Sequence, residues 1–196
     1  ALNYRIGGKD PTGWHIFSLI VHGLSALLVF GIAYRLFSGK WLPSTTAALI
    51  WAAHPLLNEA VTYQAARSSL LAGLFAPAAV YFHLSVKDNK ARVVSAAAFT
   101  AMGLASKETA AVIPVLLLLA DIPDRRNIKS RRPAYLSALG VFAAYVIYRM
   151  TVLEVPTFHI STPVRSVYSN LLTESAIIPA YAGKFLWPAG VSIEWN

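Results

Sequence analysis

Four charged side chains lie within or beside long apolar stretches of the sequence, where a charge is costly and usually serves a function. Glu59 and Arg67 are eight residues apart, so a helix through both would place them on one face, where they could hold a phosphate or a sugar hydroxyl. Lys107 and Glu108 interrupt the apolar region 93–122, and the lysine could bind the phosphate of an anionic lipid. The alternative for both pairs is structural: a Glu–Arg network at a helix end, and a Lys–Glu pair at a turn.

Two further positions are candidates for substrate contacts, and the remaining histidines are not. His54 stands at the expected end of a helix, and Arg165 lies in the polar stretch 151–174, which could contact a substrate or be a plain connector. His22 lies inside an apolar run, where we expect a hydrogen bond between helices rather than metal binding. His83 receives the same structural interpretation. The sequence has no paired His and carboxylate spacing that indicates a metal site.

The composition indicates a membrane protein. Of 196 residues, 56% are hydrophobic and 13% are charged, against about 25% charged in an average soluble domain. The mean hydropathy of +0.53 excludes intrinsic disorder. The absence of cysteine excludes a disulfide scaffold, a Cys-ligated zinc site and a thiol nucleophile in this chain. The net charge of +8 is better explained by basic loops on one side of a bilayer than by binding of nucleic acid.

The apolar runs predict helices arranged as hairpins. The run 14–37 is longer than the roughly 20 residues that a span needs. The region 93–122 would form either one helix of about 45 Å or two short helices that meet at Lys107. The flanking loops 87–92 and 123–132 carry three and five basic residues, so the positive-inside rule favours the hairpin, which places both on the cytoplasmic face. Ser106 would then cap the second helix.

The sequence therefore predicts an all-α fold: a polytopic integral membrane helical bundle, with six or seven membrane segments joined by short hairpins in one transmembrane domain over 1–196. The stretch 175–190 could span the membrane, re-enter it or lie on its surface. The expected outer loops are about 1–13, 56–67, 105–109 and 151–174, and the expected cytoplasmic loops are about 38–43, 87–92 and 123–133. Ten of the 17 basic residues then face the cytoplasm.

Several short motifs occur in an order and spacing that cover nearly the whole chain. They are Leu2-Asn3-Tyr4-Arg5 with Trp14-His15, Ala53-His54-Pro55 with Glu59-Ala60-Val61, Arg67 with Leu70-Leu71-Ala72, Ser106-Lys107-Glu108-Thr109 with Pro114 and Asp121, and Leu171-Leu172-Thr173 with Tyr181 and Trp187-Pro188. In these motifs the chain resembles the C-type glycosyltransferases, polytopic enzymes that use lipid-linked sugars. Within that class it is most similar to the transmembrane and tetratricopeptide-repeat O-mannosyltransferases and their bacterial relatives.

The resemblance implies a donor sugar on a polyprenyl phosphate and transfer on the outer face, periplasmic or lumenal, of the bacterial inner membrane or the endoplasmic reticulum. Glu59 becomes the candidate catalytic carboxylate, acting on the acceptor hydroxyl. Arg67, Lys107 and Glu108 become substrate or lipid-phosphate contacts. His54 and Arg165 are candidates for the same contacts from the residues alone, as considered above. The chain itself is assigned no metal ligand and no certain cofactor, so any divalent metal ion would be held by residues outside it.

Two departures from the family pattern matter. The family commonly has an acidic residue two positions after the arginine matched by Arg67, where this chain has Ser69. The main catalytic acid of the family lies upstream of the segment matched by 2–4, so we expect the chain to be a middle portion of the membrane domain, unable to catalyse by itself. The alternative function is a non-catalytic scaffold subunit of a larger membrane complex, derived from such a transferase. The expected partners are membrane lipids, the lipid-linked sugar and other membrane subunits, and not nucleic acid.

Overall fold

The computed structural model describes residues 12–55, 57, 66–152 and 166–186. Within these ranges every regular element is a helix and no strand occurs, which confirms the predicted all-α class. Single-turn helices of the 3-10 type are labelled η. The elements are α2 (Thr12–Leu36), α3 (Trp41–Ala52), α5 (Arg67–Ser85), α6 (Asn89–Ser106), η2 (Glu108–Val112), α7 (Ile113–Ala120), η3 (Ile122–Asn127), α8 (Ile128–Thr151) and α9 (Val167–Leu186).

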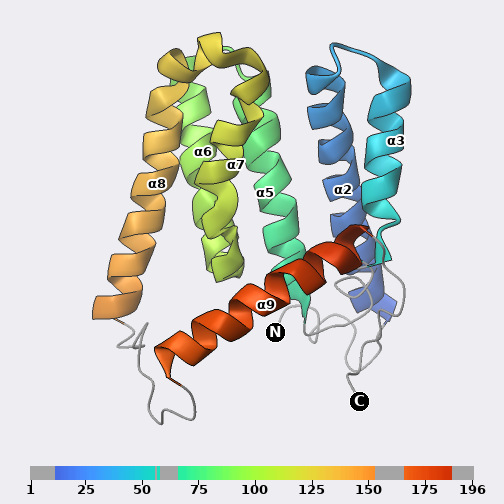
Figure 1. The fold of residues 1–196 in the computed structure, drawn as a ribbon. Helices are drawn as coiled ribbons and strands as arrows, with labels where there is room; N and C mark the ends of the chain where they lie inside the picture. The colour runs from blue at the N-terminus through green and yellow to red at the C-terminus, as the bar shows by residue number, and fades with distance from the viewer. Residues whose placement is uncertain (1–11, 56, 58–65, 153–165, 187–196) are drawn as a thin grey trace.

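The helices from α2 to α8 run up and down one bundle, so their turns gather at its two ends (Figure 1). We call the upper end in Figure 1 the basic end: it comprises the α2–α3 turn, the α5–α6 turn and η3. We call the lower end the Lys107 end: it comprises the starts of α2 and α5, the turn at Lys107 and the end of α8. α5 packs on α2 and α6, α3 packs on α2, and α8 packs on α6.

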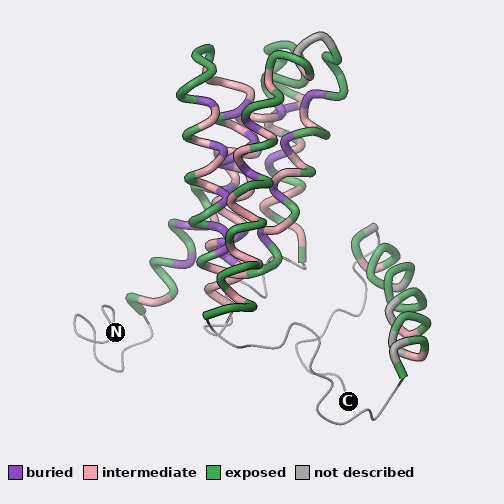
Figure 2. Tube along the Cα trace, turned by 90° about the vertical axis from the view of Figure 1, so that its left-hand side faces the viewer, coloured by how far each residue is buried: buried purple, intermediate pink, exposed green. Residues whose placement is uncertain are grey.

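Three of the described helices are long and apolar enough to cross a membrane: α2, α5 and α8. Their outer faces carry large exposed apolar side chains, such as Leu27 and Leu136, and Figure 2 shows the exposed residues along the outside of the bundle. The core between the helices is built largely from small residues, including Ala79, Ala96 and Ala138. Small side chains allow close helix contacts, as is typical of membrane helices.

Two basic segments that were expected to be cytoplasmic loops are partly helical. The Asp88 carboxylate accepts a hydrogen bond from the backbone N–H of Ala91 at 2.9 Å and caps α6. The segment 87–92 is therefore mostly the first turn of α6 rather than a loop. The segment 123–133 is likewise occupied by η3 and the start of α8.

The region 93–122 forms a hairpin that turns at Lys107, where the backbone is extended (φ −159°, ψ 142°). Ser106 does not cap the second helix as the sequence analysis expected. It is the last residue of α6, and its hydroxyl donates to the carbonyl of Met102 at 2.8 Å. Gly103 makes the close turn possible, because a Cβ at that position would lie 2.8 Å from the Cβ of Ala110.

α9 begins at Val167, inside the stretch 151–174 that was expected to be a loop. Its first turns carry exposed apolar side chains at Tyr168, Leu171 and Leu172, and this helical spacing explains why the segment folds as a helix. The helix lies across the axis of the bundle in Figure 1 and beside the bundle in Figure 2.

Candidate functional site

The first turn of α5 brings a cation to the Lys107 end. The guanidinium carbon of Arg67 lies 3.5 Å from the centroid of the Trp14 ring at the start of α2, in a cation–π contact. The Nε of Arg67 is buried and has no hydrogen-bond partner within the described part of the chain. An unsatisfied buried donor on a cation favours an incoming anion.

Lys107 lies next to the same turn of α5. Its ammonium donates a hydrogen bond to the Ser69 hydroxyl at 2.6 Å, and the lysine is half-buried. The partner is a neutral hydroxyl, so this contact orients the ammonium without cancelling its charge. Ser69 thus stands where the resemblance places an acidic residue, and its effect is to leave Lys107 electrostatically available.

The neighbouring carboxylate, Glu108, faces the end of α8. Its Oε2 lies 3.7 Å from Nη1 of Arg149, and the Glu108 side chain is 65% exposed. The same guanidinium nitrogen of Arg149 donates to the Tyr145 hydroxyl at 3.1 Å. The Glu–Arg contact is long and open to solvent, so it constrains Glu108 only weakly.

The structure places three of the predicted site residues at the same end of the bundle, in three separate pairwise contacts, and adds three others. Arg67 and Ser69 are two residues apart in α5, so Arg67 and Lys107 lie on different sides of that helix. We call the set the Lys107 cluster: Trp14, Arg67, Ser69, Lys107, Glu108 and Arg149. Arg149 was not assigned to the site from the sequence, although a charge in the last turn of an apolar span is the kind of signal that marks one.

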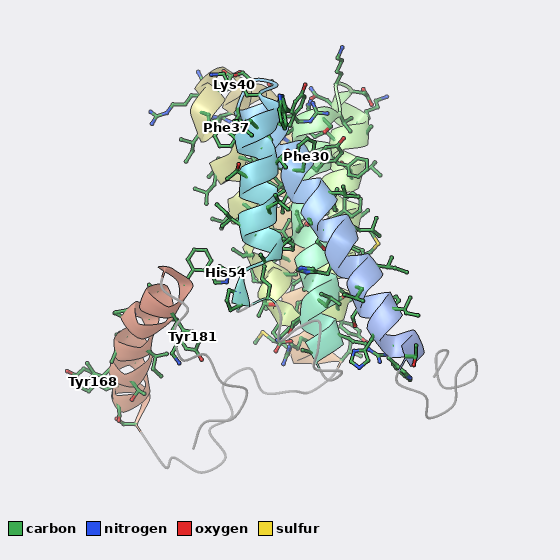
Figure 3. All side chains as sticks on the ribbon, turned by 90° about the vertical axis from the view of Figure 1, so that its right-hand side faces the viewer. Phe30, Phe37, Lys40, His54, Tyr168 and Tyr181 are labelled. Carbon is green, nitrogen blue, oxygen red and sulfur yellow. The ribbon has the colours of Figure 1, made fainter. Side chains whose placement is uncertain are left out.

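The other predicted site residues are not part of this cluster. His54 lies at the end of α3, where its Nε2 is 2.9 Å from the carbonyl oxygen of Phe185 and its ring stacks on that phenylalanine (Figure 3). It therefore contacts α9 rather than Lys107. Glu59 and Arg165 lie outside the described residues.

The Lys107 cluster suits an anion that carries hydroxyl groups. Arg67 and Lys107 offer positive charge and hydrogen-bond donors, and the exposed carboxylate of Glu108 offers acceptors. Among the described residues, no three His, Asp or Glu side chains gather in a way that could hold a metal ion.

The basic end holds a second set of charges, centred on Asp121, which was singled out from the sequence only as one residue of a motif that resembles the family. Asp121 is 1% exposed, and its Oδ2 lies 2.7 Å from Nε2 of His83. Tyr135 also donates to this carboxylate, and Arg131 forms an ion pair with it. We call these four residues the Asp121 network. Burial alone would raise the pKa of Asp121, but the hydrogen bonds from His83 and Tyr135 and the charges of His83 and Arg131 outweigh it and hold the pKa below its usual value.

Arg92 completes the basic end by closing the C-terminus of α5. Its Nε donates to the carbonyl of His83 at 3.0 Å, and its terminal nitrogens donate to the carbonyl of Val86 and the side chain of Asn89. Carbonyls at a helix end have no partner inside the helix, so this arginine supplies one. Lower in the bundle, the Nε2 of His22 lies 3.0 Å from the carbonyl oxygen of Ala52. This contact confirms the hydrogen bond between helices that was predicted for His22.

The sequence was compared with known proteins. Residues 1–148 match the family model described as dolichyl-phosphate-mannose-protein mannosyltransferase. The match includes every member of the Lys107 cluster except Arg149, which follows it by one residue. No solved structure matches the chain.

Several curated relatives are similar to this chain over part of their length. Protein O-mannosyl-transferase tmtc2 of Xenopus laevis is 36% identical over 75 residues, which is 38% of this chain and 9% of the relative. Protein O-mannosyl-transferase TMTC3 of Homo sapiens is 31% identical over 74 residues, or 38% of this chain and 8% of the relative. Protein O-mannosyl-transferase Tmtc1 of Drosophila melanogaster is 26% identical in an alignment that covers 100% of this chain and 26% of the relative. The chain thus spans about a quarter or less of these relatives.

Proposed function

Because the chain belongs to the dolichyl-phosphate-mannose-protein mannosyltransferase family, we propose that it forms part of the membrane domain of an O-mannosyltransferase. The proposed donor is a mannosyl polyprenyl phosphate, and the proposed acceptor is a hydroxyl of a protein. The observation that supports the proposal is the Lys107 cluster: one end of the bundle carries Arg67 with an unsatisfied buried donor, Lys107 bonded only to a neutral hydroxyl, and the exposed carboxylate of Glu108.

The chemistry of such a transfer assigns roles to these groups. The acceptor oxygen attacks C1 of the sugar, and the bond between C1 and the phosphate oxygen breaks, with its electron pair leaving on the phosphate. Arg67 and Lys107 stabilise the negative charge of that leaving phosphate. A carboxylate accepts the proton of the acceptor hydroxyl. Glu59 is the proposed base, and Glu108 orients the sugar or the acceptor through hydrogen bonds.

The distribution of charge supports a proposed orientation of the bundle in the membrane. The basic end carries ten basic and three acidic residues, and the positive-inside rule places such an end in the cytoplasm. The Lys107 end then faces the periplasm or the lumen of the endoplasmic reticulum. A polyprenyl-phosphate sugar presents its headgroup at a membrane surface, where the Lys107 cluster would meet it.

The test is mannosyl transfer by the full-length polypeptide that contains these residues, with dolichyl phosphate mannose as donor. We expect Lys107→Ala to lower kcat/KM by about 100-fold, as removal of one donor to a developing anion does in other enzymes. Lys107→Arg should recover part of the loss. The matched control is Lys129→Ala, an exposed lysine at the opposite end of the bundle, which should leave transfer unchanged.

Transfer at the wild-type rate by Lys107→Ala would remove the cluster from the reaction. If the wild-type polypeptide itself transferred no mannose while its folded state was intact, the scaffold alternative would be favoured. The two results are distinguishable, because the first concerns one variant of an active enzyme and the second concerns the unaltered protein.

A further inference from the structure

A cavity of about 700 Å³, lined by both charged and apolar residues, opens at the basic end, away from the Lys107 cluster. Its wall comes from the α2–α3 turn, the end of α7, η3 and α8, and it includes Arg35, Asp121, Asp124 and Arg131. Asp121 and Arg131 form an ion pair and neutralise each other, so Arg35 and Asp124 are the remaining charges of the wall. Arg35 is exposed, and its guanidinium carbon lies 5.3 Å from the centroid of the Tyr81 ring.

An apolar groove of about 620 Å³ lies beside this cavity and extends toward the middle of the bundle. It lies between α2 and α5 and is lined by leucine and aromatic side chains, Leu24, Leu27, Phe75 and Phe82 among them. Tyr34 and Arg35 line both spaces, so the cavity and the apolar groove are neighbours at the end of α2. A site with a polar head and an apolar tail in this order matches an amphiphile whose charged group lies at the membrane surface.

The dimensions of the groove fit one acyl chain. Leu24 and Arg35 are eleven residues apart on α2, which corresponds to about 16 Å along the helix. One leaflet contributes about half of the roughly 30 Å hydrocarbon thickness of a bilayer. A chain that descends from Arg35 along the groove would therefore reach Leu24 at the middle of the membrane.

The excess of basic residues at the basic end favours a lipid with a negatively charged headgroup. Basic residues at this end exceed acidic ones by seven; the basic ones are Arg35, Lys40, Lys87, Lys90, Arg92, Arg125, Arg126, Lys129, Arg131 and Arg132, and the acidic ones are Asp88, Asp121 and Asp124. Such an excess attracts anionic lipid headgroups. We propose that the neighbouring cavity and groove bind one anionic phospholipid, with its phosphate beside Arg35 and one acyl chain between α2 and α5.

The experiment uses the full-length polypeptide in detergent, stripped of lipid, with the thermal unfolding midpoint measured as lipid is added. We expect phosphatidylglycerol to raise the midpoint at concentrations about tenfold lower than phosphatidylcholine with the same acyl chains. Both lipids carry a phosphate, but the choline cation cancels the net charge of phosphatidylcholine and is repelled by the basic residues of this end. Inorganic phosphate alone should not reproduce the shift, because it cannot occupy the groove.

Variants separate the headgroup contact from the acyl contact. Arg35→Gln should weaken the binding of phosphatidylglycerol and reduce its preference over phosphatidylcholine, and Arg35→Lys should retain both. Lys40→Gln is the matched control, since Lys40 belongs to the same end but lines neither space. The affinity of this variant for phosphatidylglycerol should stay within about twofold of the wild-type affinity. Leu27 is 67% exposed in the groove, so Leu27→Asn should fold normally and weaken both lipids.

Three results would overturn the proposal. Equal effects of the two lipids would mean that the headgroup is not recognised. A full shift with inorganic phosphate would mean a site for a free anion. No effect of either lipid would mean that the remainder of the polypeptide covers the groove.

Discussion

Both ends of the bundle pair a carboxylate with an arginine, but they do so in opposite ways. At the basic end, Asp121 is buried and receives hydrogen bonds or charge from three side chains of the Asp121 network. At the Lys107 end, Glu108 is largely exposed and stands 3.7 Å from Arg149. The buried carboxylate has its acceptors filled and is a structural group. The exposed one keeps acceptors available and its cationic neighbours supply donors, which is what a binding site for an incoming molecule needs.

The largest effect should come from removing the charge of the buried carboxylate. Asp121→Asn leaves Arg131 and the rest of the network facing a neutral amide, and we expect the free energy of unfolding to fall by about 3–5 kcal/mol. Chemical unfolding of the full-length polypeptide in detergent measures it. Asp124→Asn is the control, because Asp124 is an exposed residue of η3 and its loss should cost less than about 1 kcal/mol. An equal loss of the free energy of unfolding in the two variants would contradict the structural role assigned to the buried carboxylate of Asp121.

Acid should weaken the same network without any substitution. The pKa of Asp121 is lower in the folded protein than the unfolded value of about 3.9. The stability that its charge provides is therefore fully present above that unfolded value and is lost as the pH falls through the folded pKa. Unfolding measured between pH 6 and pH 3 should show a smaller pH dependence in Asp121→Asn than in wild type. Parallel curves for the two proteins would contradict the assignment.

The hairpin that connects the two ends should respond to crowding at its turn. In Gly103→Ala the new methyl group would meet the Cβ of Ala110 at 2.8 Å and the Cδ1 of Ile113 at 3.0 Å. We expect a net loss of stability of about 1–2 kcal/mol, since overpacking costs about 1–3 kcal/mol and the alanine recovers some helix propensity. Gly140→Ala in α8 is the matched control, because nothing lies within 4 Å of the added Cβ.

The Gly140 variant should be neutral or slightly stabilising. Gly103→Ala should also impair transfer by the full-length enzyme, because the turn it shifts carries Lys107. A Gly103→Ala protein with wild-type stability would mean that the neighbouring helix moves aside easily.

The sequence was sufficient to predict the all-α class and the hairpin at Lys107, although not the start of α9, because apolar run length and loop charge are local quantities. The break at Lys107 follows from comparing one long helix with the thickness of a bilayer. Contacts between helices were harder to predict. His83 and Asp121 are 38 residues apart, and their pairing depends on how α5 and α7 are rotated against each other. The residues around His83 in the sequence do not indicate that rotation, so only a general structural role could be predicted for His83.

The same reasoning explains the mixed outcome for the predicted site. Lys107 was identified because it interrupts an apolar region, and this signal does not depend on a partner. Its hydrogen bond to Ser69 joins elements 38 residues apart and was not expected. His54 was grouped with the site because it precedes a proline near other polar residues, but position in the chain did not reveal that it would face α9.

The smallest effect should come from the exposed pair, and it is the sharpest test of the comparison. Glu108→Gln makes the same chemical change as Asp121→Asn, a carboxylate replaced by an amide of equal size. Because the pair is solvent-exposed and 3.7 Å apart, the free energy of unfolding should change by less than about 0.5 kcal/mol. Transfer activity should fall more than stability does, if the carboxylate serves the substrate rather than the fold. A stability loss above about 1 kcal/mol with unchanged transfer would show that Glu108 holds the Lys107 end together, as Asp121 holds the basic end.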